Sequence, residues 1–412
     1  MSAIYTIKAS PGKGNGIFAK RAIKAGTIIF VEKVLLQLPD TCITDEAVVE
    51  TAFSKLSFED QNRFLELHEG HRPYKSRVFR IFKANAFGDK DGSRVYDRIS
   101  RLNHSCVPNA VMVPNSTEPT VASIIASVPI SKGKEITISY SSLYNFATKA
   151  QRAGPMWMYY GFRCRCPACS LGPKEQWISD TRRRLINVLY HFLQGKSPPD
   201  WRMMEALATT MTPQQAERPE FLAMVDHHGA PLKTPPTRSQ ILAYNVLYAK
   251  LMEAEGLLGM DIAEAYAAAI IGLRQAMQAH PDVVLLPSVK AILAWYKQAR
   301  AIAEQSRGLG SWEVEKFKHL GKQMRDDGLT GPAIYFLEHP QEFHDAGMKE
   351  YYDQAFAMSQ QMIQVGGKTG LKMYICSEAE LKSVIQKGIQ PGDREDLKAF
   401  VAYAESMAPG AL

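Results

Sequence analysis

Three cysteines within six positions, Cys164, Cys166 and Cys169, constrain this chain more than any other feature of its sequence. Thiolates so closely spaced can occupy three corners of a zinc tetrahedron, and they then need a fourth ligand from elsewhere in the chain. Cys106 is the natural candidate for that ligand. The chain has only six cysteines in 412 residues. Because this usage does not resemble a secreted disulfide framework, the cluster indicates a metal site in a reducing compartment.

The stretch Arg101–Ala110, which contains Cys106, is too polar for an ordinary core segment. An amide, an imidazole, a hydroxyl and a thiol stand at four consecutive positions, from Asn103 to Cys106. Pro108 then stops any helix that might begin there, since proline lacks the N–H that a helix interior requires. The stretch therefore predicts a dense polar site.

These residues resemble the SET-domain family of S-adenosylmethionine-dependent protein lysine methyltransferases. In that family an Asn-His-Ser-Cys segment threads a knot-like crossing beside the cofactor. Three further stretches match the family's motifs in the family's order, namely Gly12–Ala19, Gly133–Tyr140 and Tyr160–Cys166. Four ordered motifs make the resemblance specific for residues 1–170, and it does not extend reliably to residues 171–412.

Apolar periodicity predicts how the first part of the chain is organised. Short runs rich in Ile, Val and Leu, bounded by turn residues, predict strands at 4–8, 27–37, 110–113, 120–126 and 135–140. Between them, residues 45–83 carry apolar side chains at helical spacing, which predicts helices ending near Phe82. The resemblance implies a helical insert over 40–83 and a zinc-binding post-SET segment over 161–170.

After Cys169 the sequence becomes helical. Apolar residues recur at three- and four-residue spacing over 174–195, 238–257, 261–279, 288–306 and 311–326. These segments resemble the carboxy-terminal helices of the SMYD group within the family. Members of that group carry a second zinc module, the MYND finger, in the insert. The insert here has only Cys42, so we expect an SMYD-like core without that finger.

The predicted fold class is α+β. Residues 1–170 are expected to form a SET-domain β-fold with a pseudoknot, a helical insert and a zinc-bound post-SET segment. Residues 171–412 are expected to form an all-α domain of helical hairpins. The left-over Cys42 and Cys376 are expected to be small buried hydrophobic residues, and Asp226–His228 is expected to be a solvated loop.

Methyl transfer from a sulfonium needs an aligned neutral amine and little water, but no metal and no covalent intermediate. The resemblance implies Tyr140 and Tyr160 as the catalytic tyrosines of a lysine channel. It also implies a structural zinc with four ligands, and a set of residues that bind S-adenosylmethionine. The zinc ligands are Cys106, Cys164, Cys166 and Cys169, and the cofactor-binding residues are Lys13, Gly14, Asn15, Asn85, Ser100, Asn103, His104, Tyr140 and Phe162.

The same residues have plainer interpretations when they are taken one at a time. The Gly-x-Gly turn at Gly12 is followed by a strand rather than a helix, which argues against a dinucleotide-binding Rossmann site. Without the other motifs, His104 would be a structural histidine, Tyr140 an ordinary strand residue and Phe162 a buried aromatic.

The charge and hydropathy of the sequence limit the partners that we expect. Residues 1–170 hold 23 Lys and Arg against 14 Asp and Glu, a net charge of +9, and the remainder carries −2. These cations are scattered without a run of five, so we expect no dedicated nucleic-acid surface. The sequence has neither a run of about 18 apolar residues nor the apolar core of a signal peptide. We therefore expect a monomer of the cytoplasm, the nucleus or both, without a membrane anchor.

The resemblance implies S-adenosylmethionine-dependent methyl transfer to a lysine of a protein or peptide. Two alternatives stay open: a SET scaffold that acts on a small molecule or in another cofactor-assisted reaction, and a non-catalytic SET adaptor. Intact Asn103, His104 and Tyr140 argue against the adaptor. The positive charge of residues 1–170 argues mildly against a histone tail, because an acidic groove suits a basic tail.

Overall fold

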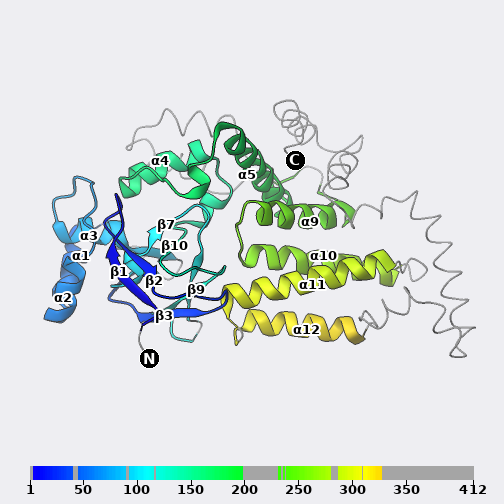
Figure 1. Cartoon of the computed structure of the whole chain (residues 1–412), viewed down its shortest axis with the longest axis horizontal. Helices are drawn as coiled ribbons and strands as arrows, with labels where there is room; N and C mark the ends of the chain where they lie inside the picture. Colours follow the sequence, from blue (N-terminus) through cyan, green and yellow to red (C-terminus); the bar gives the residue numbers. More distant parts are fainter. Residues whose placement is uncertain are drawn as a thin grey trace, which may run out of the picture. The chain divides into compact units, whose positions relative to one another are not determined.

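The structure is a computed structural model. It describes residues 3–39, 45–89, 92–115, 117–197, 231–232, 235–236, 238–279, 286–308 and 310–326. The chain forms two compact units, of which the first holds the residues up to Asp180 together with Gln305–Gly308, and the second holds the helices that follow Thr181 (Figure 1). Cys42, Cys376 and Asp226–His228 lie outside the described residues, and the domain boundary at residue 170 stays a prediction.

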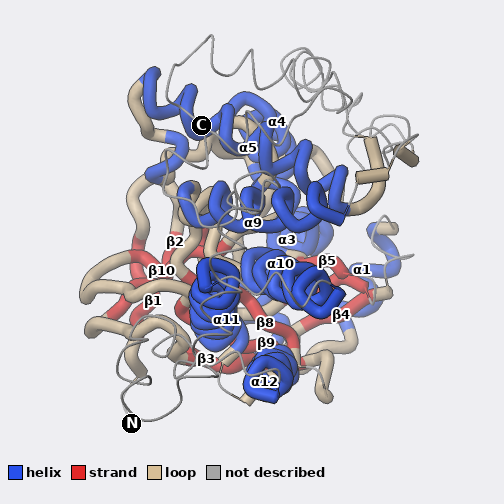
Figure 2. The backbone as a smooth tube through the Cα atoms, turned by 90° about the vertical axis from the view of Figure 1, so that its right-hand side faces the viewer, coloured by secondary structure: helices blue, strands red, loops and turns tan. Residues whose placement is uncertain are grey.

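The first unit is built on small sheets. In the first sheet the order is β1-β2-β10-β7, with bounds Tyr5–Ala9, Asn15–Ala19, Glu135–Ile138 and Asn103–His104. In the second the order is β3-β9-β8, with bounds Ile28–Lys33, Val121–Ala126 and Ala110–Pro114. In the third the order is β4-β6-β5, with bounds Leu36–Leu38, Gly92–Val95 and Phe87–Asp89 (Figure 2).

The β7–β10 pair is parallel, whereas the other strand pairs among the described residues are antiparallel. Asn103 pairs with Thr137, and His104 pairs with Ile138. Alternate residues of the neighbouring strands, such as Ile17 and Ile136, face a fully buried apolar core. This core fixes the sheet on which the polar Asn103–Cys106 segment lies.

The helical insert lies between β4 and β5. It consists of α1 Glu46–Ser54, α2 Phe58–Leu65 and α3 Arg77–Asn85. Asp45, Ser57 and Ser76 cap the three helices by accepting hydrogen bonds from first-turn N–H groups. The buried side chains form a separate apolar cluster that includes Phe64, Phe79 and Phe82. The insert therefore has its own core beside the sheets.

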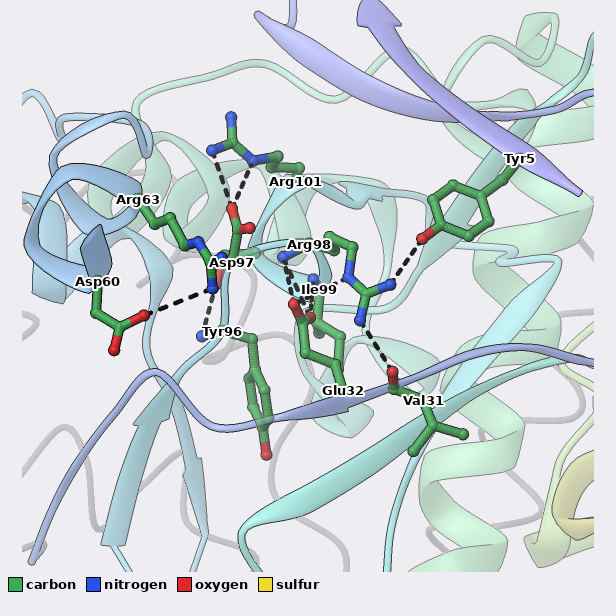
Figure 3. A network of polar contacts seen from close by, with 11 residues as sticks. Tyr5, Val31, Glu32, Asp60, Arg63, Tyr96, Asp97, Arg98, Ile99 and Arg101 are labelled. Carbon is green, nitrogen blue, oxygen red and sulfur yellow. Dashed lines mark hydrogen bonds and ion pairs between the residues drawn. The ribbon is translucent and has the colours of Figure 1, made fainter. Parts of the chain in front are cut away.

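A buried carboxylate, Glu32 on β3, fixes the segment that leads into β7 (Figure 3). It accepts hydrogen bonds from the backbone N–H groups of Arg98, at 2.9 Å, and Ile99, at 2.8 Å, at the start of the short 3₁₀ helix η2 Ile99–Arg101. The Arg98 side chain returns to Glu32 at 3.2 Å and also donates to the Tyr5 hydroxyl at 2.8 Å. Glu32 thus caps η2 and fixes the position at which β7 begins with Asn103.

The second unit is helical. After α5 Pro173–Leu193, within which the chain passes from the first unit to the second, come α9 Arg238–Ala254, α10 Met260–Ala279, α11 Leu286–Arg307 and α12 Trp312–Asp326. The last four helices stack in chain order (Figures 1 and 2). Hydrogen bonds join Glu253 to Gln298 and Arg274 to Gln323 across the stack. Every helix in the described part of the chain is too short or too polar to cross a bilayer.

The predicted helical segments after Cys169 coincide with α5, α9, α10, α11 and α12 to within about three residues at each end. Strands predicted at 110–113, 120–126 and 135–140 coincide with β8, β9 and β10 apart from their ends. The α+β fold class is confirmed by these elements. A helix at Lys149–Tyr160, α4, was not predicted, because Gly154 and Pro155 interrupt its pattern.

Replacing Glu32 by alanine leaves the N–H groups of Arg98 and Ile99 without their acceptor. Because each buried unpaired donor costs about 1–3 kcal/mol, we expect the free energy of unfolding to fall by about 3 kcal/mol in urea denaturation. Glu59→Ala is the control, since its ion pair with Arg63 is exposed and is worth less than about 1 kcal/mol. Equal losses in the two variants would contradict the role given to Glu32.

Candidate functional site

The crossing of β7 and β10 brings Asn103, His104 and Tyr140 together. The Ser105 N–H donates to the Ile138 carbonyl at 2.9 Å, which is the last ladder bond of the pair. The Tyr140 N–H donates to Nδ1 of His104 at 3.1 Å. β10 therefore ends at Ile138 rather than at Tyr140 as predicted, because β7 is only two residues long and a side chain takes over its role.

The His104 ring is buried and joins Tyr140 to the cysteines. Because Nδ1 accepts from the Tyr140 N–H, it carries no proton, and the hydrogen of the neutral ring stands on Nε2. Nε2 lies 3.2 Å from Sγ of Cys106, so it donates to that sulfur. Both ring nitrogens are thus engaged within the protein.

Tyr140, Tyr160 and Phe162 form a half-buried aromatic cluster. The ring centroids of Tyr140 and Tyr160 are 4.9 Å apart, and Phe162 lies 6.3 Å from Tyr160 and 6.4 Å from Tyr140. The Tyr140 hydroxyl donates to the Leu102 carbonyl at 3.0 Å. Three residues predicted from two separate motifs, Gly133–Tyr140 and Tyr160–Cys166, therefore meet beside β7.

Helix α4, Lys149–Tyr160, positions Tyr160 at its carboxyl end. The helix starts with a capping box formed by Thr148 and Gln151, and it ends at Gly161 in the left-handed conformation with φ 73°. A side chain at Gly161 would also collide with the His71 ring, which comes from the insert. The position therefore requires glycine, and it holds the insert against the end of α4.

Burial raises the pKa of both tyrosines. The pKa of Tyr140 is raised mainly by burial and further by the neighbouring Tyr160 and Glu135. Burial, with Tyr159 beside it, raises the pKa of Tyr160 to about 12. Both hydroxyls therefore stay protonated at neutral pH and can act as hydrogen-bonding groups rather than as bases.

A polar cluster lies at the amino-terminal turn. Nζ of Lys13 lies 2.9 Å from Oε2 of Glu135, and Nδ2 of Asn103 donates to Oε1 of Glu135 at 2.7 Å and to the Asn15 carbonyl at 3.0 Å. Burial raises the pKa of Glu135, but hydrogen bonds from Asn103, Lys13 and Ser10 outweigh it and the net pKa is lowered. The turn at Gly14 is exposed, with φ 73° and open space where a Cβ would stand.

Asn85 and Ser100 lie at the seam between the insert and η2. Nδ2 of Asn85 donates to the carbonyl oxygens of His68 and Ile81, both at 2.7 Å. The Ser100 hydroxyl donates to the Asn85 carbonyl at 3.2 Å. In this structure their side chains stabilise the insert. They would therefore support a cofactor site indirectly, without contacting the cofactor.

The four predicted metal ligands, Cys106, Cys164, Cys166 and Cys169, come together with all their sulfurs within 4.8 Å of one another. Sγ of Cys106 is 3.9 Å from that of Cys164 and 3.6 Å from that of Cys169. A tetrahedral zinc with bonds of about 2.3 Å places its sulfurs about 3.8 Å apart, whereas a disulfide needs about 2.05 Å. The donor set therefore fits zinc.

Sequence reasoning missed two residues of this site, Glu135 and Arg152. Glu135 lies within a recognised motif, but its partner Lys13 is 122 positions away, and no local pattern reveals that pair. Nη2 of Arg152, on α4, lies 3.6 Å from Sγ of Cys169. The Thr148-x-x-Gln151 capping box is the signal that could have located the helix that carries Arg152.

Comparison with known proteins identifies the central part of the site. Residues 14–141 match the SET domain family. The match runs from the turn before β2 to the residue after Tyr140, and it therefore includes Asn103, His104 and Cys106. The other three cysteines lie beyond it.

Two curated relatives are named as methyltransferases. Histone-lysine N-methyltransferase set5 of Schizosaccharomyces pombe is 31% identical over 185 residues, which are 44% of this chain and 56% of that protein. Protein-lysine N-methyltransferase SMYD4 of Homo sapiens is 41% identical over 75 residues, which are 18% of this chain and 9% of that protein. The match thus spans little more than half of the first relative and much less of the second.

Among solved structures, the SET domain of LSMT bound to lysine and AdoHcy aligns with 82% of this chain and 94% of its own chain. The sequence identity is 12% and the TM-score is 0.29. This similarity is too low to assign a role to any residue of the site.

The lowered pKa of Glu135 predicts a pH-dependent contribution to stability. Its charged form stabilises the fold above its ordinary pKa of 4.5, and this stabilisation is lost as pH falls through the lowered value. Glu135→Gln should therefore lower the melting temperature at pH 7 by about 2–4 °C. The gap from the wild type should narrow as pH falls below 4.5.

Thermal melts followed by circular dichroism at several pH values measure this gap. Glu118→Gln is the matched control, because the Glu118 carboxylate is exposed, lies 3.8 Å from Nζ of Lys33 and accepts a hydrogen bond from the Thr120 hydroxyl at 3.3 Å. It should show a small gap at every pH. A Glu135→Gln gap that does not change between pH 7 and pH 3 would show that the carboxylate charge does not contribute.

Proposed function

We propose that this chain, which carries a SET domain at residues 14–141, transfers a methyl group from S-adenosylmethionine to a lysine side chain of a protein. The observation that carries the proposal is the half-buried cluster of Tyr140, Tyr160 and Phe162 beside Asn103. Relatives named as lysine methyltransferases support the same activity.

S-adenosylmethionine supplies an electrophilic methyl group on a sulfonium when it is bound. The protein must then align a neutral amine with that methyl and exclude water. A lysine amine with an ordinary pKa of about 10.4 is mostly protonated at neutral pH. The aromatic walls contributed by Tyr140, Tyr160 and Phe162 are weakly polar and disfavour the charged amine, as does a neighbouring sulfonium.

Tyr140 is proposed to orient the amine. Its hydroxyl hydrogen goes to the Leu102 carbonyl, which leaves the oxygen lone pairs to accept a hydrogen from the amine. The nitrogen lone pair of the amine is then turned toward the methyl group. Because the pKa of Tyr140 is raised, its role is to position the amine and not to remove its proton. Tyr160 supplies the opposite wall.

The exposed turn and the polar cluster suit the amino-acid end of the cofactor. Lys13 offers a cation for its carboxylate, and Gly14 and Asn15 offer accessible backbone beside Asn103. Glu135, already paired with Lys13, offers a carboxylate for its amino group.

The other cofactor residues are assigned by position. Phe162 is proposed to contact the adenine, and His104 to hold Tyr140 in place through its ring. Asn85 and Ser100 are proposed to support the cofactor site from behind, through the seam between the insert and η2.

Zinc is proposed to be structural, with Cys106, Cys164, Cys166 and Cys169 as its four ligands and no open position. The segment 161–170 contains only the short 3₁₀ helix η4, Pro167–Cys169, and few apolar side chains to hold it. Metal binding would supply the free energy that fixes this segment next to β7. Phe162, within the segment, and Tyr160, just before it, would be fixed with it.

The remaining assignments are also proposals. Residues 1–170 would perform the chemistry, and the helical domain over 171–412 would select the partner, a protein or peptide with an accessible lysine. We expect no dedicated nucleic-acid surface, no membrane anchor and a monomer of the cytoplasm, the nucleus or both. The SMYD-like core without a MYND finger stays a prediction, because part of the insert lies outside the described residues.

Tyr140→Phe should depress methyl transfer about 100-fold or more while cofactor affinity changes less than about twofold. The hydroxyl acts on the amine in the transition state, whereas the ring alone is sufficient to line the cofactor site. Transfer is measured by mass spectrometry of a peptide library incubated with isotopically labelled cofactor, and affinity is measured by calorimetry. Tyr248→Phe, at a buried tyrosine of α9, is the matched control and should leave transfer unchanged.

Each other outcome of this experiment has a distinct meaning. Wild-type turnover in Tyr140→Phe would make Tyr140 a structural residue. A wild-type protein that consumes cofactor with a small molecule but labels no peptide would favour the small-molecule alternative. A wild-type protein that consumes no cofactor with any peptide or small molecule offered would favour the non-catalytic adaptor.

Cys106→Ser should lower the zinc content from about one ion per chain to a small fraction, because three thiolates and a hydroxyl hold zinc poorly. The melting temperature should fall with it, since metal binding contributes to folding. Elemental analysis and thermal melts measure both quantities. Cys42→Ser is the control, because Cys42 is not among the four predicted ligands. Full zinc content with unchanged melting in Cys106→Ser would remove the assignment.

A further inference from the structure

Arg152 is a buried cation beside the cysteine cluster. The residue is only 1% exposed, on the first turns of α4. One guanidinium nitrogen, Nη1, donates to the Ala147 carbonyl, and Nη2 lies 3.6 Å from Sγ of Cys169. The third nitrogen, Nε, is buried without a hydrogen-bond partner among the described residues.

No carboxylate forms an ion pair with Arg152 in the described part of the chain. Arg183 in α5, which is also fully buried, shows the usual arrangement, because its Nε lies 3.2 Å from Oε2 of Glu255. Burying an arginine without an anion is strongly unfavourable, since guanidinium cannot lose its proton in a protein. Cys106 and Cys169 raise the pKa of Arg152 more than the Asp180 carboxylate does, so the cysteine cluster supplies most of the balancing negative charge.

We infer that Arg152 is the counter-ion of the metal-bound cysteine cluster and retains the metal in it. Four thiolates around a Zn²⁺ ion leave a net charge of −2 at that point of the interior. Arg152 offsets part of this charge with an N–H donor to Cys169 from one side, and the Nε2–H of His104 donates to Cys106 from the other. The inference rests on the metal assignment under the proposed function.

The position of Arg152 also joins the metal to the aromatic cluster. Arg152 lies on the helix whose last residue is Tyr160, and the chain then continues directly into Cys164. The guanidinium therefore ties the start of α4 to the end of the cysteine segment, with Tyr160 on the helix between them. We assign Arg152 as a positioning residue, because it reaches the site only through the sulfur and the helix.

The simpler alternative is that Arg152 only stabilises the start of α4. In that case the bond to the Ala147 carbonyl would be the whole function of Arg152, and a change at Arg152 would affect stability but not the rate at which zinc leaves. Zinc release therefore separates the two interpretations. It also needs no methyl acceptor, so its result does not depend on the proposed reaction.

The test uses the full-length zinc-loaded protein and three variants. Zinc release to excess chelator is followed with a chromogenic zinc indicator, and circular dichroism checks the fold. Arg152→Met removes the charge but keeps an unbranched side chain, and it should release zinc at least tenfold faster than the wild type. Arg152→Lys keeps the charge but cannot span both Ala147 and Cys169, so its rate should lie between the two.

Arg183→Met is the matched control. It removes an equally buried arginine that pairs with the Glu255 carboxylate, so it should lower the melting temperature while zinc release stays within twofold of the wild type. Release from folded Arg152→Met at the wild-type rate would overturn the inference, and so would equal acceleration in Arg183→Met. If Arg152→Met does not fold, Arg152→Lys decides, and a wild-type rate in that variant overturns the inference.

Failure of the metal assignment has its own signature. Elemental analysis of the wild type would then show no zinc, and the inference would fail with the assignment. A wild type with about one zinc per chain, together with unchanged release from the Arg152 variants, would reject Arg152 alone.

Discussion

The contact between Cys106 and the Cys164–Cys169 segment is the interaction on which the candidate site depends. The segment that follows α4 has no strand and only one short 3₁₀ helix. A small buried cluster made mostly of cysteines, with Ala168, holds it against β7. Tyr160 and Phe162 lie on either side of the point where this segment begins, and Tyr140 is joined to Cys106 through the His104 ring. Loosening the cysteine cluster would therefore displace each wall of the aromatic cluster.

The other side of β7 is fixed by charge. Glu32 gathers the N–H groups at the start of η2, and η2 leads within two residues to Asn103. β7 itself is only two residues long, which is too short to be held by its ladder with β10 alone. A buried carboxylate on one side and a thiol cluster on the other thus hold a short polar segment that apolar packing could not position.

The sequence predicted the parts of this arrangement that have a local signal. Strand alternation and helical spacing located most elements, and the clustered cysteines indicated their own partner. The missed parts depend on tertiary contacts. Glu135 acquires its role from Lys13, and Arg152 from Cys169, and neither partner is near in sequence. The sequence also did not indicate that the Asn85 side chain donates to the His68 carbonyl in the insert, because His68 lies in a loop that has no periodic pattern.

We propose that the cysteine cluster assembles the cofactor site. Calorimetric titration of S-adenosylhomocysteine into zinc-loaded and metal-stripped protein tests it most directly, with circular dichroism to confirm that the stripped protein keeps its strands and helices. We expect one binding site per chain in the loaded protein and affinity at least tenfold weaker after the metal is removed. Equal affinity in the two forms, with both folded, would contradict it.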